Sequence, residues 1–301
     1  MTAPTVLHPG GDGRAAIARD SDGAVEVHLA PNHPGAGDPA YRARRAAIAG
    51  LALGWEPGRP LPEVEYAPEE HATWKAVCAG LRTAWEEGAC RSHLEAVEEL
   101  GLPTDRVPQL AEVGHRLAGA TGFRYQPVAG LAPLRTFYRS FGEGVFWSTQ
   151  YLRHSSNPLY TPEPDICHEV LGHAHQLADR RWAACYRRVA ACTDRLETPE
   201  ALSFLSRVFW FTAEFGVIRE GGELRAYGAG LLSSVGELGA FRSADVRDLD
   251  WVEMGTATYD ITNYQPVLYA AGSLDELFDR LTAFLDEFDD DTHARLAASA
   301  R

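Results

Sequence analysis

Apolar residues recur every three or four positions in three long segments, the pattern of a helix with one buried face. Each segment opens with residues typical of a helix start, namely Pro68 with Glu69, Pro199 with Glu200, and Ser273 with Glu276, a capping box. The apolar stripes that follow are Trp74, Val77, Leu81 and Trp85; Leu202, Leu205, Val208 and Phe209, continuing to Phe215 and Ile218; and Leu277, Phe278, Leu281, Phe284, Leu285 and Phe288. The pattern predicts a mainly α protein.

Strand-like alternation is confined to short pieces at residues 123–129, 144–150 and 223–228. Residues 1–38 are rich in Gly, Pro and Asp, and one hairpin is expected there because Asp22-Gly23 precedes an alternating run. No repeat or internal linker divides the chain. We therefore expect a partly flexible lead-in over residues 1–30, one mainly α domain with a few short strands over 31–290, and a tail over 291–301.

Composition narrows the classes of partner. The chain has 42 acidic and 28 basic residues, a net charge of -14, so nucleic acids and anionic membranes are disfavoured. No run of 18 apolar residues is present, and the N-terminus lacks the pattern of a secretory signal. The five cysteines form no CxxC pair, which is typical of reduced thiols in a cytoplasmic protein.

The segment YTPEPDICHEVLGHAHQLAD at residues 160–179 carries the densest chemistry. His168 and His173 are five residues apart, about 140° around an ideal α-helix, so an unbroken α-helix cannot aim both at one ion. Gly172 offers a place where the helix could end and the backbone turn. The spacing differs from that of the HExxH zinc proteases. His175 and His154 remain alternative ligands.

A carboxylate from elsewhere would complete a site of two histidines and one acid, which leaves positions open on iron(II) for O2. Glu214 is the best candidate because it lies in the apolar run FWFTAEFG, where an unpaired carboxylate is costly. Glu169 is expected to point away from the ion. The residues alone leave a zinc hydrolase and a catalytically inactive binding module open.

At these residues the sequence resembles the pterin-dependent aromatic amino acid hydroxylases. The resemblance covers about residues 31–288 and is carried by the blocks at 32–49, 60–77, 121–137, 145–173, 209–216 and 226–238. It implies a mostly helical catalytic domain that uses Fe(2+), a tetrahydropterin and O2 to hydroxylate the ring of a free aromatic amino acid. The resemblance includes neither the regulatory domain nor the tetramerisation helix of the animal enzymes, so a monomer or dimer is expected.

The resemblance also implies roles for individual residues. His168, His173 and Glu214 correspond to the iron ligands, and Arg153, braced by Asp165, to the arginine that binds the substrate carboxylate. The substrate pocket is expected to include Tyr160, Thr161, Pro164, Trp210, Phe215, Gly230, Ser233 and Ile261, with the Ser233 hydroxyl behind a ligating histidine. The pterin site is expected to include Gly130, Leu131, Ala132, Phe137, Trp147, Glu169 and Phe209.

Three departures from the family pattern affect the expected chemistry. Trp147 replaces a common histidine, Phe209 replaces a common tyrosine, and Ala174-His175 replaces Val-Pro directly after His173. The last change could tilt the substrate ring toward a meta product. Trp210 favours phenylalanine, with tryptophan 5-hydroxylation as the alternative, and Ile261 makes tyrosine the least expected substrate.

Overall fold

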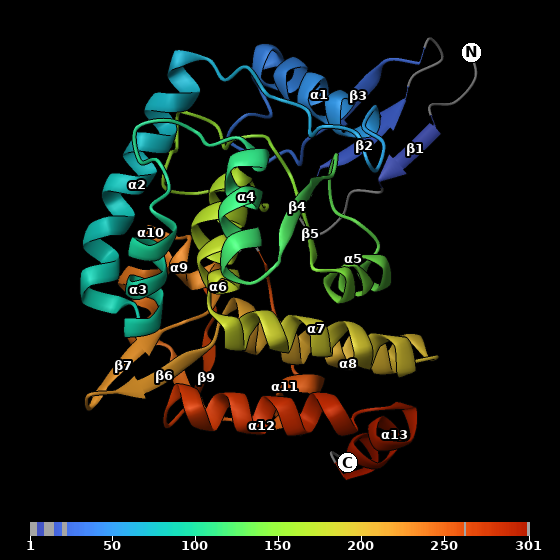
Figure 1. The fold of residues 1–301 in the computed structure, drawn as a ribbon, viewed down its shortest axis with the longest axis vertical. Coiled ribbons are helices and arrows are strands. Elements are labelled where there is room, and N and C mark those ends of the chain that lie inside the picture. Colours follow the sequence, from blue (N-terminus) through green and yellow to red (C-terminus); the bar gives the residue numbers. More distant parts are fainter. Residues whose placement is uncertain (1–4, 9–14, 20–22, 262, 300–301) are drawn as a thin grey trace.

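The computed structural model describes residues 5–8, 15–19, 23–261 and 263–299. Helices dominate it (Figure 1). The α-helices are α1 (Pro39–Leu53), α2 (Pro68–Gly88), α3 (Arg91–Leu100), α4 (Leu110–Ala120), α5 (Leu134–Ser140), α6 (His175–Ala178), α7 (Arg180–Arg195), α8 (Pro199–Phe209), α9 (Ala229–Leu232), α10 (Val235–Ala240), α11 (Trp251–Thr256), α12 (Leu274–Glu287) and α13 (Asp290–Ser299). Two 3-10 helices, η1 (Phe141–Glu143) and η4 (Phe241–Ser243), and two π-helices, η2 (His168–Ala174) and η3 (Trp210–Glu214), complete the set.

Three small sheets accompany the helices. An antiparallel sheet contains β1 (Thr5–His8), β2 (Ala16–Arg19) and β3 (Val25–His28), and a parallel pair contains β4 (Arg124–Pro127) and β5 (Val145–Ser148). The third sheet has the order β7 (Glu223–Ala226), β6 (Val217–Glu220), β9 (Val267–Ala271) and β8 (Asp245–Asp248). The three strand-like pieces of the sequence correspond to β4, β5 and β7 and are confirmed.

The helical stripes form the core as predicted. Trp74, Val77, Leu81 and Trp85 of α2 are all buried, and so is the apolar face of α12. Figure 1 shows α7 and α8 crossing the middle of the molecule, with α12 packed beneath α7. Ser273 accepts a hydrogen bond from the Glu276 backbone N–H at 3.1 Å, which caps α12. The predicted core faces therefore place the long helices around the centre.

The end of the second predicted helix was wrong. The α-helix stops at Phe209, η3 follows to Glu214, and Ile218 lies in β6 instead of the helix. Gly216 explains the change of direction, because the Tyr227 ring approaches so closely that a Cβ at this position would lie 2.1 Å from it. Val217 and Ile218, which are β-branched, then pair with β7 and β9.

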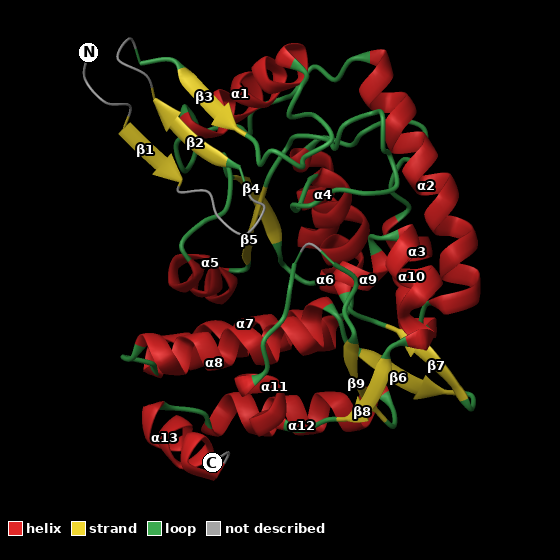
Figure 2. Ribbon diagram, turned by 180° about the vertical axis from the view of Figure 1, so that it is seen from behind, coloured by secondary structure: helices red, strands yellow, loops and turns green. Residues whose placement is uncertain are grey.

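The N-terminal region contains more regular structure than predicted. β2 and β3 pair as the expected hairpin, although Asp22 itself lies outside the described residues. β1 adds a third strand, and Figure 2 shows the sheet beside α1. Ile17, Val27, Ala49 and Ala129 form a small separate core beneath it. Among the described residues, no helix is long and apolar enough to span a membrane.

Candidate metal centre and its cavity

The segment after Asp165 forms a π-helix, not a broken α-helix. In η2 the hydrogen-bond repeat is five residues, so His168 and His173 lie one above the other on the same face. The predicted turn at Gly172 was therefore wrong. A Cβ at Gly172 would lie 2.6 Å from the Ala229 carbonyl oxygen, so this glycine lets α9 pack against η2.

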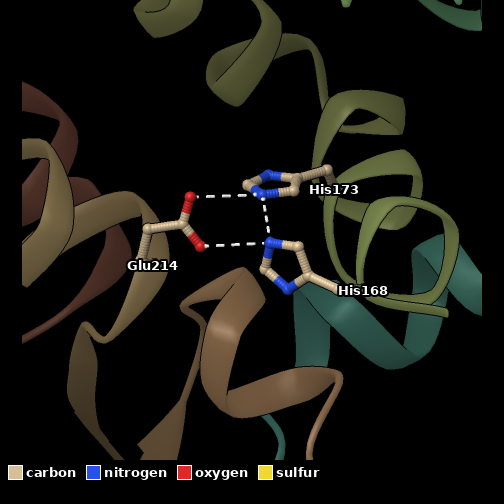
Figure 3. Close-up of side chains that lie close together, drawn as sticks. All are labelled: His168, His173 and Glu214. Carbon is tan, nitrogen blue, oxygen red and sulfur yellow. Dashed lines mark hydrogen bonds and ion pairs between the residues drawn. The ribbon is translucent and has the colours of Figure 1, made fainter. Parts of the chain in front are cut away.

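The second π-helix positions Glu214. The Phe215 N–H donates to the Trp210 carbonyl at 2.9 Å, a five-residue repeat that closes η3. Glu214 thereby points at the two histidines (Figure 3). Its Oε1 lies 3.2 Å from His173 Nε2, and its Oε2 lies 3.6 Å from His168 Nε2. Two π-helices, both unusual elements, thus meet at one point.

The tautomers of both histidines follow from the contacts behind them. Ser233 Oγ donates to the Ala229 carbonyl and so accepts from His168 Nδ1, 2.9 Å away. His173 Nδ1 lies 2.9 Å from the Tyr186 hydroxyl, which donates to Gln176. Both Nδ1 atoms therefore carry the proton, and both Nε2 atoms present lone pairs to the centre.

This donor set fits a divalent metal ion. The two Nε2 atoms lie 3.0 Å apart with no proton to share, and Glu214 Oε2 is buried without a hydrogen-bond partner among the described residues. Three electron pairs facing one another repel unless a cation lies between them. Two histidines and one carboxylate on one face are typical of non-haem iron.

Burial governs the protonation of the centre. Burial, followed by the neighbouring His173, lowers the pKa of His168 to about 4. Burial also raises the pKa of Glu214, but positive charge on His173 and His168 would more than offset that effect, so the net pKa lies below its ordinary value. A neutral imidazole and an ionised carboxylate are the forms that bind metal.

A cavity of about 610 Å³ opens beside the three side chains. Every residue predicted for the site lines this cavity except Asp165. The lining includes the three candidate ligands; Arg153, Tyr160, Thr161, Pro164, Trp210, Phe215, Gly230, Ser233 and Ile261; and Gly130, Leu131, Ala132, Phe137, Trp147, Glu169 and Phe209. Site residues spread between Gly130 and Ile261 are thus brought together around one space.

Arg153 and Asp165 form a buried ion pair at the edge of this cavity. Their side chains are 3% and 0% exposed, and the guanidinium donates through Nε and one terminal nitrogen at 2.9 and 2.8 Å. Asp165 also accepts from the Arg153 backbone at 2.8 Å and from the His168 backbone at 3.2 Å. Asp165 therefore ties the arginine to the start of η2.

Three aromatic side chains pack together in the wall of the cavity. Trp210 stacks on Tyr259, with ring centroids 4.3 Å apart, and packs against Phe215 at 4.5 Å. The Trp210 indole N–H donates to the Gln265 side chain at 3.2 Å, which fixes the ring. A Cβ at Gly230 would lie 2.7 Å from the Phe215 ring, so glycine keeps this wall close to α9.

Comparison with known proteins shows the family to which this chain belongs. Residues 22–298 match the model of a family described as biopterin-dependent aromatic amino acid hydroxylase. The chain belongs to this family. It is 46% identical over 259 residues to a phenylalanine 3-hydroxylase of Streptomyces coeruleorubidus, covering 86% of this chain and 93% of that protein. The predicted family is confirmed, and the zinc hydrolase alternative is set aside.

Two further hydroxylases extend the comparison. The chain is 44% identical to tyrosine 3-monooxygenase of Mus musculus over 83% of its own length, but spans only 51% of that protein. Its fold matches phenylalanine hydroxylase of Chromobacterium violaceum in a structure with bound iron(III) and 7,8-dihydrobiopterin. That match has a TM-score of 0.72 and 29% identity, and covers 79% of this chain and 90% of the other. The predicted hydroxylase fold is confirmed.

The three departures from the hydroxylase pattern lie in different places. Trp147 and Phe209 line the cavity, as expected. His175 does not line it, because its ring lies 5.3 Å from His93 and 5.6 Å from Trp85, and its Nδ1 bonds the Leu171 carbonyl. Ala174 is fully buried and also does not line the cavity. Ala174 and His175 therefore cannot act on the substrate ring by direct contact, contrary to what the sequence had suggested.

The alternative ligands do not reach the hydroxylase centre. His154 bonds Ser156 and lies 3.2 Å from Asp38, on the outer side of the fold. Within the described residues, only His168, His173 and Glu214 form a group of three that could hold one metal ion. Glu169 turns toward the cavity, and burial followed by Glu214 raises its pKa well above its ordinary value.

Sequence reasoning missed the two polar residues behind His173. Tyr186 and Gln176 are buried, and they lie on α7 and α6, which are not among the three helices that the apolar pattern predicted. Their sole signal in the sequence is a glutamine and a tyrosine on buried helical faces, since such polar groups require partners.

Proposed function

We propose that this chain is an iron(II)- and tetrahydropterin-dependent phenylalanine hydroxylase that places the hydroxyl group at the meta position. The observation that carries the proposal is the cluster of His168, His173 and Glu214 at the wall of a cavity that also contains an arginine fork and an aromatic wall. The phenylalanine 3-hydroxylase that this chain matches over 93% of that protein's length supports both the substrate and the position.

The chain's own residues would divide the work as follows. Arg153 binds the substrate carboxylate with the edge of its guanidinium that Asp165 leaves free. Trp210 and Phe215 hold the apolar ring. Bound iron(II) would activate O2 and the reduced pterin would supply two electrons, with one oxygen atom going to the ring and the other to the pterin. Phe137 and the loop at residues 130–132 would hold the pterin.

Product identification tests the proposal. The iron-loaded protein is incubated with tetrahydropterin, O2 and phenylalanine, tryptophan or tyrosine in separate reactions, with metal-free protein as the control. We expect meta-tyrosine from phenylalanine, slower turnover of tryptophan, and almost none of tyrosine. Formation of para-tyrosine would support phenylalanine as the substrate but refute hydroxylation at the meta position. Predominant formation of 5-hydroxytryptophan would refute phenylalanine as the substrate and favour the tryptophan alternative.

Two further expectations remain predictions. The chain is proposed to be a monomer or a dimer, not the tetramer of the animal enzymes, which light scattering tests. A cytoplasmic location is proposed from the reduced cysteines, and cell fractionation tests it. All five cysteines are free and buried, which agrees with a reducing compartment.

A further inference from the structure

A continuous chain of hydrogen bonds runs behind the metal centre and joins its two π-helices. It begins at His173 Nδ1 in η2, passes through the Tyr186 hydroxyl of α7 and the Gln176 side chain of α6, and ends at the Ala213 carbonyl in η3. Ala213 is the residue directly before Glu214. The chain therefore links one candidate ligand to the backbone that carries another.

The direction of every bond in this chain is determined. Gln176 Nε2 donates to two carbonyl oxygens, those of Ala213 at 3.0 Å and Tyr227 at 3.3 Å, so its amide cannot be flipped. Its Oε1 can then only accept, and the Tyr186 hydroxyl proton points to it at 2.5 Å. The Tyr186 oxygen is left as an acceptor, so His173 Nδ1 must carry the proton.

Packing holds this chain in place. Tyr186 is 1% exposed, and its ring lies 4.9 Å from Phe141 and 5.5 Å from Phe209, measured between centroids. Gln176 is 4% exposed. Neither side chain lines the cavity. They touch no substrate, so any effect on the chemistry must pass through His173 and the backbone of η3.

We propose that Tyr186 and Gln176 are positioning residues that hold the Nε2 lone pair of His173 on the metal and set the separation of the two ligand-bearing π-helices. The proposal rests on the proposed metal-dependent function. Without the Tyr186 hydroxyl, the His173 ring is free to rotate and to place its proton on Nε2, which cannot bind metal in that form. Ser233 supports His168 in the same manner from α9.

The test uses Tyr186→Phe, which keeps the ring and removes only the hydroxyl. Tyr227→Phe is the matched control, because Tyr227 is 2% exposed and thus about as buried as Tyr186, but its hydroxyl has no hydrogen-bond partner among the described residues. Cobalt(II) serves as the probe, and its dissociation constant and visible spectrum are measured for each full-length protein. Circular dichroism of the metal-free proteins confirms that each variant folds.

Tyr186→Phe is expected to weaken cobalt binding about 10- to 100-fold and to alter the visible spectrum, as for other outer partners of ligating histidines. Tyr227→Phe is expected to match the wild type. Wild-type affinity and spectrum in Tyr186→Phe would overturn the proposal, provided that Glu214→Ala has lost the metal. If Glu214→Ala binds cobalt as the wild type does, the proposed metal site and this proposal both fall.

A second variant tests whether the two residues act as one chain. Gln176→Met removes both the acceptor for Tyr186 and the donor to Ala213 while keeping a similar volume. Because Gln176 reaches His173 only through Tyr186, the double variant is expected to lose less affinity for cobalt than the product of the two single losses. It should still bind more weakly than Tyr186→Phe alone, since the bond to Ala213 is also removed. Losses that simply multiply, or normal binding by Gln176→Met, would overturn the role of Gln176 in the chain.

Discussion

Replacing Arg153 by alanine leaves the carboxylate of Asp165 buried without a counter-charge. The pair is 3% and 0% exposed, and the guanidinium supplies two of the hydrogen bonds that Asp165 accepts. Removal of one partner of a buried pair costs about 3–5 kcal/mol of stability. If Arg153 also binds the substrate carboxylate, its removal costs about 2–5 kcal/mol of transition-state stabilisation. The value of kcat/KM then falls about 30- to 5,000-fold.

Two assays separate the structural loss from the binding loss. Urea denaturation measures the free energy of unfolding, and kcat/KM is compared between free phenylalanine and its amide. Arg139→Ala is the matched control, because its ion pair with Asp194 is 52% and 61% exposed and is expected to contribute less than about 1 kcal/mol. Arg153→Lys should also perform poorly, since a point charge does not replace a fork.

The ratio of kcat/KM for free phenylalanine to kcat/KM for its amide shows whether Arg153 binds the substrate carboxylate. A purely structural arginine would lower stability but leave the preference for the free amino acid over its amide unchanged. That result would refute the assignment of Arg153 to the substrate carboxylate. A variant that loses neither stability nor preference would refute the energetic argument for the buried pair as well.

Three further predictions follow from the same cavity. Glu214→Ala is expected to fold but to bind well under one iron per chain and form no hydroxylated product, since it loses one of three ligands; full occupancy would contradict the assignment. Trp210→Phe is expected to raise kcat/KM for tryptophan relative to phenylalanine about 10-fold, and an unchanged ratio would remove Trp210 as the selective wall. Burial raises the pKa of Glu237 to about 7, although the Gln265 backbone lowers it. Because the pKa of Glu237 in the folded state lies above its ordinary value of 4.5, its contribution to the free energy of unfolding is complete below pH 4.5. That contribution is lost as the pH rises toward 7. Glu237→Gln should therefore raise the free energy of unfolding by about 3 kcal/mol near pH 8 but not near pH 4, and equal gains at both would refute the shifted pKa.

The long helices were predictable because the local spacing of their apolar residues indicates which face is buried. Trp74, Leu81 and the stripe of α12 recur at helical spacing, and that spacing alone requires a buried face. The strands β6, β8 and β9 were not predicted. Each is four or five residues long, so its periodicity is too short to separate it from a loop, and the pairings of β9 with β6 and β8 bridge long stretches of chain.

The residue types of the metal centre were also predictable from the sequence. The sequence contains two histidines close together, an acid in an apolar run, and an arginine with an acid nearby. Burying such polar and charged groups is costly unless each has a partner, so their presence predicts a site. Their spacing pointed to the wrong backbone, however. A five-residue separation is unfavourable on an α-helix, and only the structure shows that η2 winds as a π-helix with Gly172 packed against Ala229.

The sequence by itself determined which groups are available: the ligands, the buried ion pair, the aromatic wall and the helical core. Only the tertiary structure decided how they are held. The π-helices depend on contacts between segments far apart in the chain, such as Gly172 with Ala229 and Gln176 with Ala213. Tyr186 acquires its partner through the packing of α7 against α6, the helix that precedes it in the chain. Local periodicity predicts which face of a helix is buried. It does not predict which polar atom from another segment will be the hydrogen-bond partner of a buried side chain on that face.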